Sequence, residues 1–495
     1  MALNNHILTI TEPQIQLDEL KFPSLKEEKG DTKISKGFGT DRIPFVIINN
    51  YIFNDADIKS FEIRNDNFIP TIELTIVDSK SQFSVDTFPR DGDVISIRIG
   101  SRQQDQYKDI RIDFDIDRVD SNMKLTTEIG SGGAKYSFTG KMKVPGLYAE
   151  ECKSYGVGTS LDHLETIAND LELGLSTNID KSDDEMNLVI AYQSVYETIE
   201  NLAKHSYVSD ESFQTIAIDP YYYLNYVDMN ALLNSENDFN EDVIFGLIDN
   251  FNEEASQDNS INELKTKNLL TNHPKFESVN LYIGKYALNN KSGSKVKKNG
   301  YKRTLQFFED DSDEGLVSFD IEPLNSENLK DIEEPLKGRR DEERYKREVK
   351  FKYMGRKDSD PDTANTHLNY TFAALHNKQN LEEIDKLSLN VELPALNPAL
   401  HRFQKIPVMI FNITSQQTNA DSVLKEKKGD KGFDTTPAED FNDDKLSDKT
   451  TMDEFLSGFY IINSIVYKYN NRDGKVRQEM NLIRREWPSR INNIG

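Results

Sequence analysis

The stretch that decides the fold reads Gly458-Phe-Tyr-Ile-Ile-Asn-Ser-Ile-Val-Tyr-Lys-Tyr-Asn-Asn-Arg-Asp-Gly-Lys-Val-Arg-Gln-Glu-Met-Asn-Leu-Ile-Arg-Arg-Glu-Trp487. Two runs rich in β-branched and aromatic residues flank a turn at Asn471–Gly474. Gly474 can take the positive φ angle of a tight turn without steric cost. The stretch therefore predicts a β-hairpin, and a similar pattern occurs in the first third of the chain.

The first third of the chain predicts one strand after another. Apolar residues alternate with polar ones in Ile72–Ile76, Ile95–Ile99 and Ile110–Ile116. This period of two indicates half-buried strands, with one apolar and one wet face. Turn signals at Pro89–Gly92 and Gly130–Gly133 separate them. Several short strands with turns between them favour a barrel or a sandwich.

The period then changes to that of helices. A first helix is expected after Thr159, with Gly174 where a C-terminal cap belongs. A second helix is expected after Ser194, because Glu197 three residues later completes a capping box. Two strand-like segments around Pro220 follow. This middle part reads as a small α+β unit.

Strand signals return near the C-terminus in a similar order. Both sets run strand, spacer, strand, turn, strand: Asp93–Ile99, Ile112–Val119 and Lys135–Gly140, then Ile406–Phe411, Gly458–Val466 and Gln478–Ile483. We interpret this as a weak duplication of one β unit. The alternative is that all antiparallel meanders look alike in sequence.

Composition narrows the function classes. With 60 Lys and Arg against 85 Asp and Glu, the formal charge is −25, so the chain is a poor candidate for a nucleic-acid clamp. The only cysteine, Cys152, excludes an intramolecular disulfide and favours synthesis in a reducing compartment. We see no signal peptide and no apolar run of about 18 residues, and expect no membrane insertion.

No catalytic motif is recognisable. Asp113-Phe-Asp-Ile-Asp117 resembles the start of a calcium loop, but Arg118 and Lys124 occupy positions that need Gly and Glu. The seven histidines lie without metal-ligand spacing: His6, His163, His205, His273, His367, His376 and His401. We therefore predict no catalytic, cofactor-binding or metal-binding residues, no cofactor and no enzymatic activity. A glycosidase-like pair of carboxylates stays a minor alternative.

Several phrases carry a resemblance to a known family: Phe61–Asp78, Phe88–Ile95, Thr159–Ala168, Tyr192–Leu202, Ile218–Tyr226 and Phe459–Pro488. In their order they resemble the baseplate central hub proteins of contractile-tailed, T4-like phages. That family is related to the late control protein D family and to the hub part of type VI secretion spike proteins. The resemblance covers the two β units and the middle helices.

In that family three copies form a ring, and each copy gives two similar barrels. The resemblance thus implies a homotrimeric hub of a contractile injection system, located in the virion tail baseplate and assembled in the host cytoplasm. Its partners would be the tail tube protein above, the central spike protein below and possible wedge proteins. DNA would cross the bore without specific binding, and our hypothesis is that the negative charge makes this bore acidic.

Type VI spikes continue into an oligonucleotide-fold domain and a β-helix. The chain printed above ends soon after its second β unit, so we expect the spike, and any cell-wall activity, to belong to separate polypeptides.

The predicted fold is mainly β with α+β insertions: two related antiparallel β-barrel, tube-like domains and a small helical α+β middle domain. The expected parts are an N-terminal arm (1–43), a first tube-like barrel (44–150), a helical α+β linker (151–211), strands returning to the second barrel (212–229), an inserted, polar, loosely structured region (230–400) and a second tube-like barrel (401–495) with a long loop (416–454).

Two other functions stay open. One is another tail or baseplate component, such as a tube initiator or a wedge protein. The other is a carbohydrate-binding, adhesin-type β protein, for which Tyr221–Tyr223 is the obvious aromatic cluster. We interpret these tyrosines as core and interface residues rather than as a sugar platform.

Overall fold

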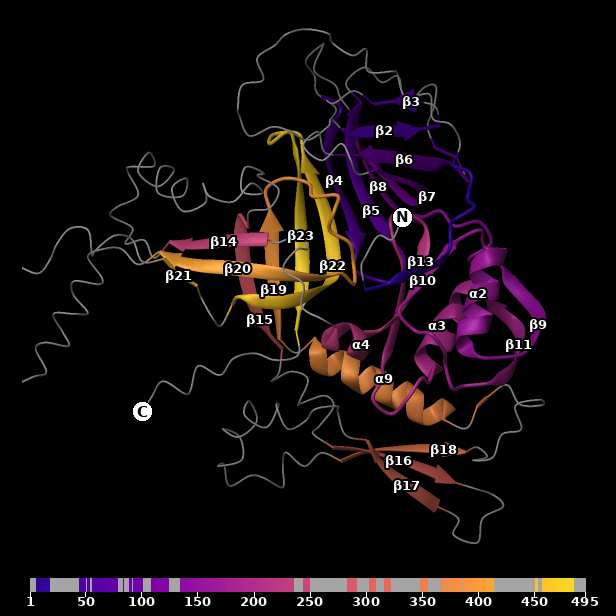
Figure 1. Ribbon diagram of the computed structural model, residues 1–495. Helices are drawn as coiled ribbons and strands as arrows, with labels where there is room; N and C mark the ends of the chain where they lie inside the picture. The colour runs from indigo at the N-terminus through magenta and orange to yellow at the C-terminus, as the bar shows by residue number, and fades with distance from the viewer. Residues whose placement is uncertain are drawn as a thin grey trace, which may run out of the picture.

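The computed structural model (Figure 1) describes the backbone of residues 6–17, 44–49, 51–53, 56–78, 83, 89–90, 92–100, 108–123, 134–235, 244–249, 283–291, 302–308, 316–321, 348–354, 366–367, 369–385, 387–413, 450–452 and 456–484. The loop predicted at 416–454 lies outside these ranges apart from residues 450–452, as does most of the arm predicted at 1–43.

Two β units form one curled 14-stranded sheet, which confirms the prediction of a mainly β fold (Figure 1). The first unit holds β2 (Phe45–Ile48), β3 (Tyr51–Ile52), β4 (Ile58–Asn65), β5 (Thr71–Asp78), β6 (Val94–Ile99), β7 (Ile110–Met123) and β8 (Ala134–Met142). The second unit holds β14 (Ile244–Asp249), β15 (Lys285–Asn290), β19 (Leu387–Leu393), β20 (Lys405–Ile413), β21 (Thr450–Met452), β22 (Gly458–Asn470) and β23 (Lys475–Ile483).

The hairpin predicted from the opening stretch is present. β22 and β23 pair antiparallel from Ile461–Ile483 to Asn470–Lys475. Gly474 takes a φ of 61°, and the N–H groups of Asp473 and Gly474 both donate to the Asn470 carbonyl. The turn therefore uses the conformational freedom of glycine at the position that the sequence indicates.

The two β units share the same strand order and a β-bulge at the same position. The order β4-β5-β8-β7-β6 in the first unit matches β15-β19-β23-β22-β20 in the second, antiparallel throughout. β7 has a bulge at Asp117 and β22 has one at Asn463. Each bulge comes two residues after the last residue that pairs with β6 or β20, which are Asp115 and Ile461. A generic meander has no reason to repeat a bulge in register, whereas related units do.

A separate four-stranded sheet lies in the middle part, with the order β1-β10-β13-β12. Its strands are β1 (Leu8–Thr11), β10 (Gly174–Thr177), β12 (Gln214–Ile218) and β13 (Tyr223–Asp228). We had expected the strands at 212–229 to join the second β unit. They pair within this four-stranded sheet instead. Residues 8–11 of the predicted arm form its edge.

Helices and a hairpin complete the middle part. They are β9 (Glu150–Gly158), α2 (Ser160–Asp170), β11 (Met186–Ser194), α3 (Val195–His205) and α4 (Met229–Asn234). Capping boxes start both long helices, Thr159 with Asp162 and Ser194 with Glu197, as expected for the second. The prediction for Gly174 is wrong. The cap is Leu171, Glu172 takes the positive φ of 57°, and Gly174 begins β10.

The region predicted as loosely structured (230–400) supplies regular elements. β14, β15 and β19 join the large sheet, and α9 (Tyr370–Ile384) packs on α3. A three-stranded sheet comprises β16 (Lys302–Phe308), β17 (Leu316–Ile321) and β18 (Glu348–Met354). The second β unit therefore begins well before residue 401. Its missed strand is β19, in which Leu389, Val391 and Leu393 are buried.

One apolar core runs through both β units and the middle part. It includes Ile72 and Phe138 from the first unit, Leu164 from α2, and Leu389 and Tyr460 from the second. Since all three parts share this core, the β units are held in one fixed arrangement by burial as well as by strand pairing.

Gly174→Ala tests the close packing at the start of β10. An added Cβ would lie 2.5 Å from Cδ1 of Tyr223 and 2.9 Å from Pro13, so ring and backbone must shift. We expect a loss of about 1–3 kcal/mol in the free energy of unfolding, measured by urea denaturation. Gly284→Ala is the control, because its Cβ meets its nearest neighbour at 3.5 Å. Equal losses in the two variants would contradict the packing argument.

Candidate functional site: the joint between the two β units

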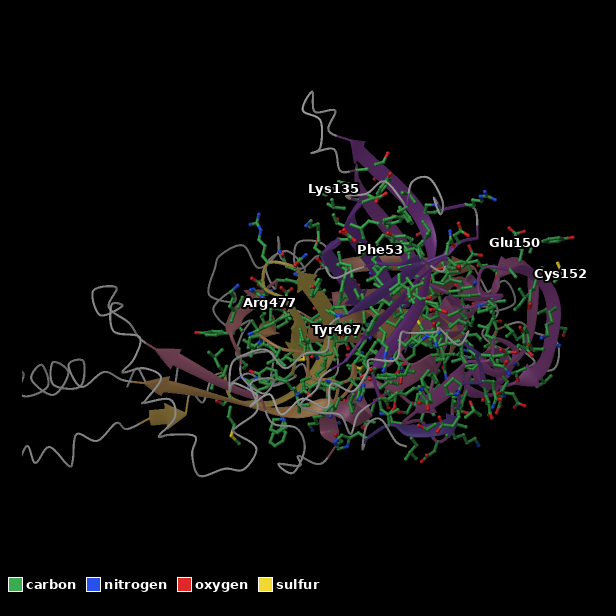
Figure 2. All side chains as sticks on the ribbon, turned by 90° about the horizontal axis from the view of Figure 1, so that it is seen from above. Phe53, Lys135, Glu150, Cys152, Tyr467 and Arg477 are labelled. Carbon is green, nitrogen blue, oxygen red and sulfur yellow. The ribbon has the colours of Figure 1, made fainter. Side chains whose placement is uncertain are left out.

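The two β units meet where β22 pairs antiparallel with β4. The register runs from Ile465 opposite Asn65 to Asn470 opposite Ser60. On the core side Phe61 stacks on Tyr469, with ring centroids 5.2 Å apart and an angle of 16° between the planes. Tyr467, labelled in Figure 2, is buried two residues before Tyr469 on β22, opposite Ile63. The joint is thus a continuous run of sheet with a packed apolar side.

Arg402 fastens one end of this joint. Its Nε donates to the carbonyl of Asn463, the bulge residue of β22, at 2.7 Å. Its two terminal nitrogens reach the turn after β4, where they donate to the carbonyls of Asp66 and Asn67 and to Oδ1 of Asn65. Burial lowers the pKa of the guanidinium to about 10, and it stays charged at neutral pH. A planar guanidinium can hold several oxygens at once, so Arg402 joins the first unit to the second.

The face opposite the core carries interleaved charges, and we call it the junction face. It comprises Glu62, Arg64, Glu73, Lys285, Glu392, Lys468, Lys475, Arg477 and Glu479, which stand on neighbouring strands. Lys468 Nζ lies 2.6 Å from Glu479 Oε2, and Arg477 Nη1 lies 3.1 Å from Glu392 Oε1. Five basic and four acidic side chains therefore nearly cancel along this face.

Two hollows lie on the junction face. One, of about 310 Å³, is lined by residues such as Glu62, Lys468 and Arg477. The other, of about 520 Å³, is lined by residues such as Lys285, Glu392 and Glu479 at the far edge of the second unit. Both are open and mixed in charge, and neither gathers convergent polar groups as a small-molecule site would.

The candidates singled out in the sequence do not converge on a site. Asp113 and Asp115 are half-buried on β7, and Asp117 is exposed at the bulge. Among the described residues no group of three or more His, Cys, Asp or Glu could hold a metal ion. Cys152 is exposed on β9, at the rim of the molecule (Figure 2). None of the described helices is long and apolar enough to cross a membrane.

The three tyrosines at 221–223 are structural, as interpreted. Tyr221 and Tyr222 lie in the turn from β12 to β13, and Tyr223 begins β13. Tyr222 has a φ of 68°. Tyr222 Oη accepts from the Asp113 N–H at 3.1 Å, and Tyr223 Oη donates to Glu12. Tyr222 and Tyr223 are 4% and 6% exposed, so they cannot form a platform for a sugar ring.

The same turn contains a buried carboxylate, Asp219. It accepts from the N–H groups of Tyr221 at 2.8 Å and Tyr223 at 3.0 Å. Burial raises its pKa to about 6 despite these hydrogen bonds. The Ile218 N–H donates to the Phe68 carbonyl, and the Tyr221 ring packs edge-on against His401. The turn therefore contacts both β units next to Arg402.

Comparison with known proteins finds no family model that matches the chain and no match among curated proteins. Solved structures give similarities. The tail protein from Neisseria meningitidis MC58 has 8% identity and a TM-score of 0.45, over 90% of this chain and 97% of that one. The 43 kDa tail protein of prophage MuSo2 from Shewanella oneidensis has 9% identity and a TM-score of 0.45, over 90% and 99%. A half-lidded Francisella PdpA-VgrG complex has 9% identity and a TM-score of 0.39, over 91% and 60%.

Arg402→Ala should weaken the joint. The change leaves carbonyls of both units without their donor, so we expect the free energy of unfolding to fall by roughly 1–3 kcal/mol. Arg472→Ala, in the exposed turn of the hairpin, is the matched control and should change it by less than about 0.5 kcal/mol. Urea denaturation followed by tyrosine fluorescence measures both. An Arg402 variant as stable as the control would show that the hydrogen bonds of Arg402 contribute nothing to the stability of the joint.

Asp219→Asn should change how stability depends on pH. Because the folded-state pKa of Asp219 is raised, its favourable contribution is complete below about pH 4 and is lost as the pH rises through 6. The stability difference, variant minus parent, should rise by about 2–3 kcal/mol from pH 4 to pH 7.5. Glu185→Gln, at an exposed position, should show no such trend. A difference independent of pH would show that Asp219 ionises normally.

Proposed function

We propose that the chain is the structural baseplate hub of a contractile tail or of a related injection machine. One observation carries the proposal: two β units with the same strand order and the same bulge are joined edge to edge in one chain. A trimer of such a chain presents six similar units, so it could join a sixfold tail tube to a threefold central spike. The phrases that resemble the hub family support the same assignment.

The work of such a hub is binding and positioning. Its partners would be the tube protein above, the spike protein below and possible wedge proteins, in the virion tail baseplate after assembly in the host cytoplasm. The division of the chain into two tube-like barrels around a middle domain belongs to this proposal, and so does the absence of enzymatic activity. A tube initiator or a wedge protein is the nearest alternative.

We propose further that the junction face lines the bore. Its charged side chains are paired with one another, for example Lys468 with Glu479, which leaves few cations to hold phosphates. The near balance of charge does not agree with the hypothesis of an acidic bore, and we drop that hypothesis for this face. A neutral, ion-paired wall would let DNA pass because it neither holds nor repels the backbone strongly.

Light scattering after size exclusion tests the hub assignment. We expect about 170 kDa, three times the 56.8 kDa of one chain, for the chain alone or with its spike protein. Negative-stain images of the same peak should show a ring with six similar lobes. A chain that stays monomeric with tube and spike proteins present would contradict the hub and favour a peripheral tail part.

A further inference from the structure

The two strands that form the joint, β22 and β4, have equivalents elsewhere in the chain that do not pair with each other. Matching the two bulges and the shared strand order makes β7 equivalent to β22 and β15 equivalent to β4. The matched residues are Val119 with Ile465, Asp120 with Val466, Ser121 with Tyr467, Tyr286 with Phe61, Leu288 with Ile63 and Asn290 with Asn65. In the joint, β22 and β4 pair with each other. β15, in contrast, is the last strand at one end of the described sheet, and β7 lies near the other end, where β6 pairs with only its N-terminal half.

β15 exposes side chains that the joint buries. Tyr286 and Leu288 stand opposite Val391 and Leu389 and so point to the core side of the sheet. They are 42% and 40% exposed, whereas their equivalents Phe61 and Ile63 are 2% and 0% exposed. Among the described strands, β15 pairs only with β19. An edge strand with exposed core-facing aromatic and aliphatic side chains is a liability unless something covers it.

β7 presents the complementary edge. Its residues 110–115 pair with β6, and the Ile116 N–H donates to the Asp93 carbonyl just before β6. Within the described part of the chain, residues 118–123 pair only with β8. The equivalent residues of β22, Ile465–Asn470, pair with β23 on one side and with β4 on the other. Asp120 and Ser121 are exposed. The C-terminal half of β7 therefore has a row of backbone groups available to another strand.

We propose that β7 of one copy pairs antiparallel with β15 of the next copy, in the register of the β22–β4 joint. This proposal rests on the proposed function and specifies its interface. Carrying over the register places Val119 opposite Asn290, Asp120 opposite Asn289, Ser121 opposite Leu288, Asn122 opposite Ala287 and Met123 opposite Tyr286. The pairing would cover Tyr286 and Leu288 on the core side, as the joint covers Phe61 and Ile63.

The geometry also explains why the assembly would close. The contact is heterologous, because it joins two different edges, and such contacts give rings when the rotation between units divides a full turn. If the contact between copies repeats the contact within the chain, every unit is related to the next in the same way. Three copies then form a ring of six units in which both edges of each copy are used.

Cysteine crosslinking tests the register. In a Cys152→Ser background, Ser121→Cys with Leu288→Cys should form disulfides between copies under mild oxidation, because facing residues of antiparallel strands have Cα atoms about 4.5–5.5 Å apart. Non-reducing gels should show species up to three linked chains. The matched control pairs Ser121→Cys with Ala287→Cys, whose side chain points to the opposite face of the sheet and should not crosslink.

A charge on the β15 edge tests the apolar part independently. Leu288→Lys should abolish the trimer in light scattering at micromolar concentration and leave the melting temperature of the monomer within a few degrees, since Leu288 is exposed. Tyr192→Lys is the control: Tyr192 is 83% exposed on β11, away from either edge, and its change should leave the trimer intact.

The outcomes separate this pairing from the hub assignment. A trimer that neither crosslinks in this register nor responds to Leu288→Lys overturns the pairing and leaves the hub. Specific crosslinks that continue beyond three chains support the pairing and overturn the trimeric ring. A chain that stays monomeric with tube and spike proteins present, and forms no crosslinks, overturns both.

Discussion

Strand β22 pairing with β4 is the contact on which the rest of the structure depends. It turns two β units into one sheet, and it places the stack of Phe61 on Tyr469 in a shared core. Arg402 adds a polar fastening at the point where the bulge of β22 meets the turn after β4. Burial, strand pairing and the several hydrogen bonds of the Arg402 guanidinium all act at this joint. The angle between the two β units is therefore set by several independent interactions.

The middle part also contacts both β units close to the joint. The turn between β12 and β13 reaches the first unit through the Ile218 N–H and the second through Tyr221, so the small sheet braces both. A buried carboxylate at this turn, Asp219, is held by two backbone N–H groups yet carries a raised pKa. Desolvation therefore outweighs hydrogen bonding at this carboxylate.

Local chemistry made part of this fold predictable. Gly474 marks the hairpin and Glu197 completes a capping box, since both signals act within a few residues. β19 was missed because it lies among polar segments, and Gly174 was misread because a close approach to Tyr223, not a helix cap, requires it. No local sequence pattern predicts the joint between the two β units. Pairing between β4 and β22 joins strand edges that are distant in sequence, and the hydrogen bonds of Arg402 depend on where the bulge of β22 places the Asn463 carbonyl.

The distance along the chain between β4 and β22 also sets an order of events during synthesis. About 400 residues separate Asn65 from Ile465, and a ribosome adds roughly 5–20 residues each second. Strand β4 therefore exists for about 20–80 seconds before its neighbour strand β22 is made. During that interval the β4 edge, with Phe61 and Ile63, is open to any other strand in the cell, including that of a nascent sister chain. Misassembly is therefore a greater risk during translation on the polysome than after the chain is finished.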